Sequence, residues 1–228
     1  MKVVNDGAED NKSRRTFMRF SAVAAASAVA FGVDVEGLGL SSAFAQAAAV
    51  DVGSGDFGVL NFAYALEQLE AAFYTQVLTT PYRGMSAYEA QVLTGIRDHE
   101  IAHRETFRVA LNLFAIPDLQ PNFSRVDFGS RASVLKTAST FEDLGVSAYN
   151  GAGQYLSNAL FLALAGSIVS VEARHAALLR DLIHPYSSYF AGDDVVDHAG
   201  LDVARLPSHV LPLAAPYIAT PISAQQLP

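Results

Sequence analysis

The chain has 228 residues, with 15 basic and 23 acidic side chains, six histidines and no cysteine. The net charge of −8 at pH 7 argues against a nucleic-acid partner, because proteins that bind nucleic acids carry a basic surface. The absence of cysteine excludes disulfides and thiolate ligands, so a bound metal would have to be held by His, Glu or Asp.

Residues 1–45 have the layout of an export signal. Arg14 and Arg15 precede the apolar run FSAVAAASAVAFGV, and a small-residue cleavage site ends at Ala45. The run of about 14 residues is shorter than the roughly 20 that a membrane span needs, so we expect a cleaved signal and not an anchor. The sequence SRRTFMR resembles the twin-arginine (Tat) export signal. That resemblance implies the Tat machinery as a partner and a final location in the periplasm, the cell envelope or the surroundings of a bacterium.

Four segments with helical periodicity follow, after a small-residue linker over residues 46–55. They span residues 56–80, 86–116, 130–153 and 157–184. Asp56 is the expected N-cap of the first, and Ser86 with Glu89 forms a capping box at the start of the second. The fourth is capped by Ser157 or Asn158, and prolines follow the first, second and fourth.

This order of elements predicts an all-α four-helix bundle over residues 56–184. Two of its connections are short, while residues 117–130 are long enough to cross the length of the bundle, so that the second and third helices can run parallel. An up-and-down bundle without this crossover is also sterically allowed. Residues 185–228 contain six of the nine prolines and are expected to form an irregular arm over the bundle, or over a neighbouring copy in a homo-oligomer.

A repeated pattern of glutamate, histidine and tyrosine stands out in the helices. The second and fourth helices each carry a Glu-x-x-His motif, and the first and third each carry a glutamate seven residues before a tyrosine. The residues are Glu67, Tyr74, Glu100 and His103 in the first half, and Glu142, Tyr149, Glu172 and His175 in the second. The two halves therefore read as a repeat, and each half supplies two carboxylates and one imidazole.

One glutamate from each of two helices, plus a Glu-x-x-His motif from each of the other two, is the ligand set of di-metal carboxylate bundles. On these residues the chain resembles the ferritin-like superfamily, and more narrowly the exported ferritin-like domain proteins, which are similar to plant desiccation-related proteins. The resemblance implies two iron or two manganese ions. It also implies that Glu100 and Glu172 bridge them, that Glu67 and Glu142 bind terminally, and that His103 and His175 each supply one nitrogen.

Other polar residues lie close to these positions. Glu70 is an alternative to Glu67 as the ligand from the first helix, or an additional ligand; the repeat places Gly145 opposite Glu70, which favours Glu67. Tyr74 and Tyr149 are expected to hydrogen-bond the ligating carboxylates. Asp98 and His99 precede the second-helix motif and are expected on its flank, since each residue turns the helix by about 100°.

Two functions remain open from the sequence. The first is an exported di-metal protein that reacts with dioxygen or hydrogen peroxide as a small-molecule oxidant, as a ferroxidase, a peroxidase or a catalase-like enzyme. Carboxylate and imidazole ligands suit iron and manganese. The second is a non-enzymatic structural or stress protein of the cell envelope that uses the bundle as a scaffold.

Overall fold

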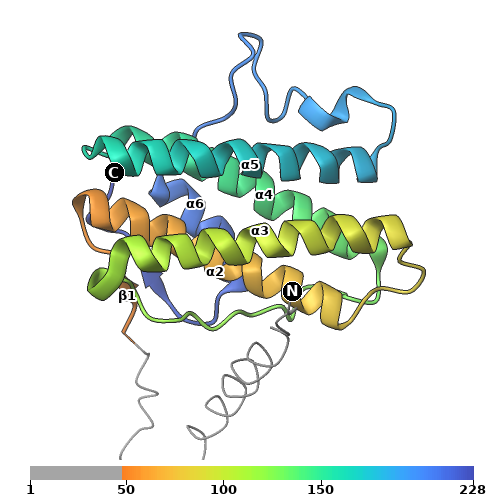
Figure 1. The fold of residues 1–228 in the computed structure, drawn as a ribbon, viewed down its shortest axis with the longest axis horizontal. Helices are drawn as coiled ribbons and strands as arrows, with labels where there is room; N and C mark the ends of the chain where they lie inside the picture. The colour runs from red at the N-terminus through yellow and green to blue at the C-terminus, as the bar shows by residue number, and fades with distance from the viewer. Residues whose placement is uncertain (1–47) are drawn as a thin grey trace, which may run out of the picture. The chain divides into compact units, whose positions relative to one another are not determined.

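The computed structural model describes residues 48–228, which form an all-α bundle (Figure 1). The predicted export signal, residues 1–45, lies outside the described residues. The main helices are α2 (Gly55–Thr79), α3 (Ala87–Leu111), α4 (Arg131–Ala152) and α5 (Ala159–Ile183). The short elements are β1 (Val50–Asp51), η1 (Asn112–Phe114), η2 (Gly153–Tyr155), η3 (Ser188–Ala191), α6 (Pro207–Ala214), η4 (Ala215–Tyr217) and β2 (Ile222–Ser223).

The bundle consists of two helical hairpins joined by the predicted crossover. Helix α2 packs against α3, and α4 packs against α5. Arg131, at the start of α4, donates from Nε to Glu89 at the start of α3 over 2.5 Å, and from Nη2 to the carbonyl oxygen of Leu182 near the end of α5 over 2.9 Å. The starts of α3 and α4 therefore lie at the same end. Residues 115–130 must run the length of the bundle to connect them, as the green segment in Figure 1 does.

The predicted C-terminal end of the second helix is wrong. Helix α3 ends at Leu111 and not at Ile116, because the side chain of Asn61 takes up backbone groups that a longer helix would need. It donates to the carbonyl oxygen of Phe114 over 2.9 Å and accepts from the amide of Ile116 over 2.9 Å. Asn112, at the end of α3, has a φ of 50°, which turns the chain out of the helix.

Asp56 is not the N-cap of α2. Ser54 occupies that position, and Asp56 instead accepts from the amides of Ser157 and Asn158, over 2.7 and 2.9 Å, where α5 begins. The starts of α2 and α5 therefore lie together at the other end of the bundle. The capping box of Ser86 is present as predicted, and Asn158 caps α5.

The segments on either side of the bundle are more regular than predicted. Within the expected linker, β1 pairs in parallel with β2, and Val52 is buried because its apolar side chain finds partners in the core. Within the expected arm, α6 packs against α4 and buries Val210 and Ala214. Residues 217–219 also hydrogen-bond to the crossover at 120–122. The C-terminal segment is thus partly built into the domain.

Two apolar clusters fill the bundle around a layer of buried polar residues. One cluster includes Phe73, Leu93 and Phe141. The other, nearer the start of α2, includes Leu60 and Phe107. In this layer each of the four long helices contributes at least one fully buried glutamate: Glu67, Glu100, Glu142 and Glu172.

Helix α5 is long and apolar enough, by length and composition alone, to cross a membrane. In the structure it packs against α4 and buries Glu172, His175 and Arg180. Three buried polar residues on one helix face fit a helix that packs within this domain.

Candidate metal centre

The structure brings all six predicted ligands together in the polar layer. They form two overlapping groups, and within each group one donor atom per residue lies within 4.8 Å of the others. The first group is Glu67, Glu100, His103 and Glu172, and the second is Glu100, Glu142, Glu172 and His175. Every long helix contributes, and the glutamates of α3 and α5 belong to both groups.

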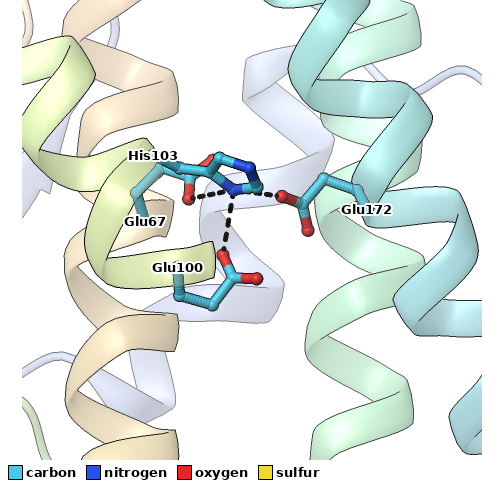
Figure 2. A group of neighbouring side chains, drawn as sticks. All are labelled: Glu67, Glu100, His103 and Glu172. Atoms are coloured by element: carbon cyan, nitrogen blue, oxygen red, sulfur yellow. Dashed lines mark ion pairs between the residues drawn. The ribbon is translucent and has the colours of Figure 1, made fainter. Parts of the chain in front are cut away.

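The first group converges on the inner ring nitrogen of His103, as Figure 2 shows. Its Nδ1 atom lies 2.7 Å from Oε1 of Glu172, 3.5 Å from Oε2 of Glu100 and 3.5 Å from Oε2 of Glu67. The Glu-x-x-His spacing explains part of this contact, because residues three apart on a helix lie on the same face. The other two carboxylates come from α2 and α5.

The second group repeats this arrangement around His175. Its Nδ1 atom lies 2.9 Å from Oε1 of Glu100, 3.3 Å from Oε2 of Glu142 and 3.8 Å from Oε2 of Glu172. Glu100 and Glu172 therefore each direct one carboxylate oxygen to His103 and the other to His175. That is the arrangement a carboxylate needs to bridge two ions.

The buried polar atoms without a hydrogen-bond partner mark the same centre. Among residues 48–228 they are Oη of Tyr82 and eight atoms of the predicted ligands. Both oxygens of Glu100 and Glu172 are unpartnered, but only Oε2 of Glu67 and of Glu142. The short distances to the imidazoles are thus not aligned as hydrogen bonds. Buried polar atoms without a hydrogen-bond partner are rare in folded proteins and indicate a place where an ion or a water molecule binds.

Tyrosines account for the difference between the two kinds of glutamate. Tyr149, on α4, donates its hydroxyl hydrogen to Oε1 of Glu67 on α2. Tyr74, on α2, donates to Oε1 of Glu142 on α4 over 2.5 Å. Each of these glutamates therefore keeps one oxygen free for the centre, as a terminal ligand requires, and the expected hydrogen bonds from the tyrosines are present.

Burial and mutual contact shift the pKa values of the cluster strongly. Burial lowers the pKa of His103 and of His175, but the surrounding carboxylates outweigh it and raise both to about 12. For Glu172, burial raises the pKa, but the two histidines outweigh it and lower it to about 2. Burial raises the pKa of Glu67 and Glu142 well above the usual value, helped by neighbouring carboxylates. In the metal-free protein, protons therefore balance the charge of this layer.

The same residues fit a pair of divalent cations. Four carboxylates carry four negative charges, which two such cations neutralise, so the layer can be buried without a net charge. The four glutamates are fully buried, and the side chains of His103 and His175 are 12% and 6% exposed. The donors are oxygen and imidazole nitrogen, the ligands that iron and manganese accept.

Glu70 lies beside the centre but belongs to neither group. It is buried, and a methyl group on Gly145 would lie 3.2 Å from its Oε1 atom, so the glycine on α4 leaves room for this carboxyl group. Burial, and then the charge of Glu172, raise the pKa of Glu70 well above its usual value. The structure thus places Glu67, and not Glu70, in the ligand group from α2.

His99 makes a contact that the sequence analysis did not predict. It is exposed on the flank of α3, as expected, yet its Nδ1 atom lies 2.9 Å from Nε2 of His175 on α5. The two rings lie nearly parallel, 10° apart, with their centroids separated by 5.1 Å. This contact crosses between two helices, so neither the spacing nor the repeat signals it. Asp98 faces away and pairs with Arg97.

Comparison with known proteins supports this assignment of fold. A family model described as a ferritin-like domain matches residues 55–185, which span α2 to α5 and contain all six predicted ligands. Among curated protein sequences, none matches this chain significantly. The family match covers more than half of the chain, and the chain therefore belongs to the ferritin-like domain family.

Proposed function

We propose that this protein is an exported di-metal carboxylate protein that holds two iron or two manganese ions and reacts with dioxygen or hydrogen peroxide. One observation carries the proposal. Glu100 and Glu172 each have two carboxylate oxygens without a hydrogen-bond partner, whereas Glu67 and Glu142 each have one. This pattern matches two bridging and two terminal ligands without any further assumption about the sequence.

The first ion would be held by Glu67, Glu100, His103 and Glu172, and the second by Glu100, Glu142, Glu172 and His175. When bound, such a pair of ions can exchange electrons with dioxygen or peroxide. The terminal carboxylates keep their orientation because Tyr149 and Tyr74 each hold one oxygen.

The chain also supplies a proton source and a dry environment. The pKa of Glu70 is raised well above its usual value by burial and by four of the cluster carboxylates, so Glu70 keeps a proton more readily than a free carboxyl group does. Apolar side chains close the layer on both sides, which excludes water and strengthens every electrostatic interaction within it.

The decisive experiment is metal analysis of protein matured through its own export route, combined with stopped-flow mixing of the reduced protein with dioxygen or peroxide. We expect about two iron or manganese ions per chain and an oxidation that consumes the added oxidant. The matched control is the same protein after chelation. Less than about 0.2 metal ion per chain at saturating metal, and no turnover, would refute the proposal and favour the envelope scaffold.

Export is proposed from the sequence alone, from Arg14 and Arg15 and the apolar run after them. A double substitution, Arg14→Lys with Arg15→Lys, keeps the charge and removes only the arginine pair. We expect the uncleaved precursor to accumulate inside the cell, as seen by cell fractionation. Normal maturation of this variant would contradict a twin-arginine signal.

A further inference from the structure

The contact between His99 and His175 makes the two halves of the centre different. A ring nitrogen that binds a cation must carry a lone pair, so Nδ1 of His175, which faces the carboxylates, must be unprotonated there. The proton of the neutral ring then lies on Nε2, and Nδ1 of His99, 2.9 Å away, is placed to accept it. His99 therefore favours the tautomer and the ring orientation of His175 that cation binding requires.

The equivalent histidine in the other half lacks this support. Within the described part of the chain, Nε2 of His103 has no hydrogen-bond partner, and the three short contacts of the ring all involve Nδ1. His99 immediately precedes the first Glu-x-x-His motif, and Val171 immediately precedes the second. Valine has no group that could hydrogen-bond to His103, so the sequence itself breaks the symmetry at this position.

Apart from Glu70, which has Gly145 as its counterpart and belongs to neither ligand group, the two ligand groups are matched between the halves. Each group contains one terminal glutamate held by a tyrosine, the same two shared glutamates, and one Nδ1 atom. The imidazole of His103 is also slightly more exposed than that of His175, 12% against 6%. Both differences act in the same direction, because a fixed and better buried imidazole loses less freedom when it binds an ion.

We propose that the position bounded by His175 binds a divalent cation about 10 to 100 times more tightly than the position bounded by His103, and that His99 causes the difference as a positioning residue. This inference rests on the proposed function, since it assumes that the centre binds cations. It goes further by assigning an order of filling, in which the His175 position fills first.

Titration of the metal-free full chain with Co²⁺ or Mn²⁺ tests the inference, followed by calorimetry and, for Co²⁺, by its visible absorption. Two steps in the unmodified protein are not diagnostic, because adjacent cations repel each other even at identical sites. Single-position variants remove this complication: Glu67→Gln leaves the His175 position and Glu142→Gln leaves the His103 position. We expect the first variant to bind one cation about 10 to 100 times more tightly than the second.

Substitution of His99 in these two backgrounds isolates its role. We expect His99→Ala to weaken binding about 10- to 100-fold in the Glu67→Gln variant and to leave the Glu142→Gln variant unchanged. His99→Asn, which retains a hydrogen-bond acceptor, should restore much of the lost affinity. Asp98→Ala, a neighbouring exposed change, is the control and should change neither variant.

The outcomes separate this inference from the proposed function. Equal affinities in the two single-position variants, or an equal effect of His99→Ala on both, would overturn the inference alone. Failure of the unmodified chain to bind any cation would overturn the inference together with the proposed function. Tighter binding by the Glu142→Gln variant would reverse the assigned order and also refute the role of His99.

Discussion

Replacement of Glu172 by glutamine tests the shared-ligand geometry most directly. Glu172 is fully buried and contributes to both cation groups, one oxygen facing each histidine. Glutamine keeps the size of the side chain but removes its charge. With two divalent cations bound, the layer would then carry one uncompensated positive charge in a dry core.

The size of the effect follows from that charge. Removing one partner of a buried charge pair costs about 3–5 kcal/mol. Since about 1.4 kcal/mol corresponds to a factor of ten, the variant should bind cations a hundredfold to a few thousandfold more weakly, by this order-of-magnitude reasoning. Both positions should be affected, whereas Glu67→Gln and Glu142→Gln should each lose one ion, because each of these residues belongs to one group.

The assay is equilibration of the metal-free proteins with Mn²⁺, or with Fe²⁺ without oxygen, followed by gel filtration and elemental analysis. Glu105→Gln, a change at a partly exposed position on α3 outside both groups, is the matched control and should retain the full content. Circular dichroism of each metal-free protein shows whether the variant is folded. A folded Glu172→Gln protein that retains two ions would refute the bridging role.

Three further predictions concern stability. The two cluster histidines have a pKa of about 12 in the folded protein, against about 6.5 when unfolded, so their contribution to metal-free stability is complete below pH ~6.5 and is lost as the pH rises toward 12. We therefore expect the metal-free Tm to fall between about pH 7 and pH 9. The Tm gain on adding Mn²⁺ should grow over about the same interval, because cations displace these protons; a gain that shrinks would contradict this. In Gly151→Ala the added methyl group would lie 1.8 Å from the carbonyl oxygen of Arg205, so the free energy of unfolding should fall by about 1–3 kcal/mol, as measured by thermal unfolding. The control is Gly153→Ala, where a methyl group would meet no neighbouring atom within 4 Å, and its stability should be nearly unchanged. Arg180→Met removes a buried guanidinium that binds Asp143 on α4 and Asp194 in the C-terminal segment, so hydrogen exchange in residues 188–206 should accelerate. Unchanged protection of these residues would show that the ion pair of Arg180 with Asp194 does not anchor the segment.

The bundle and its ligands were accessible to prediction because the relevant signals are local. Capping residues mark the starts of α3 and α5, and the Glu-x-x-His spacing puts a carboxylate and an imidazole on one face. The repeat between the halves then related Glu67 to Glu142, and the chain length from 117 to 130 allowed the crossover that the structure confirms. Each of these inferences needs only the residues of one segment or a comparison of two.

The features that were missed depend on contacts between distant segments. Helix α3 ends early because Asn61, on another helix, captures the backbone after Leu111. The pairing of β1 with β2, and the contact of His99 with His175, likewise join residues far apart in the sequence. A strand of two residues is too short to show a periodic pattern in the sequence. The partner of a histidine on the flank of a helix depends on which helix packs beside it, and the sequence of one helix does not contain that information.

The pairing of β1 with β2 has a consequence for the order of folding. Gln226 donates a hydrogen bond to Asp51 across a separation of 175 residues, whereas each helical hairpin closes over a short turn. Contacts of such long range form late, because the loop between them must first become compact. We therefore expect β1 and β2 to pair last, after the two helical hairpins have packed together. In a partly folded chain, both ends of the domain should then be accessible to proteases.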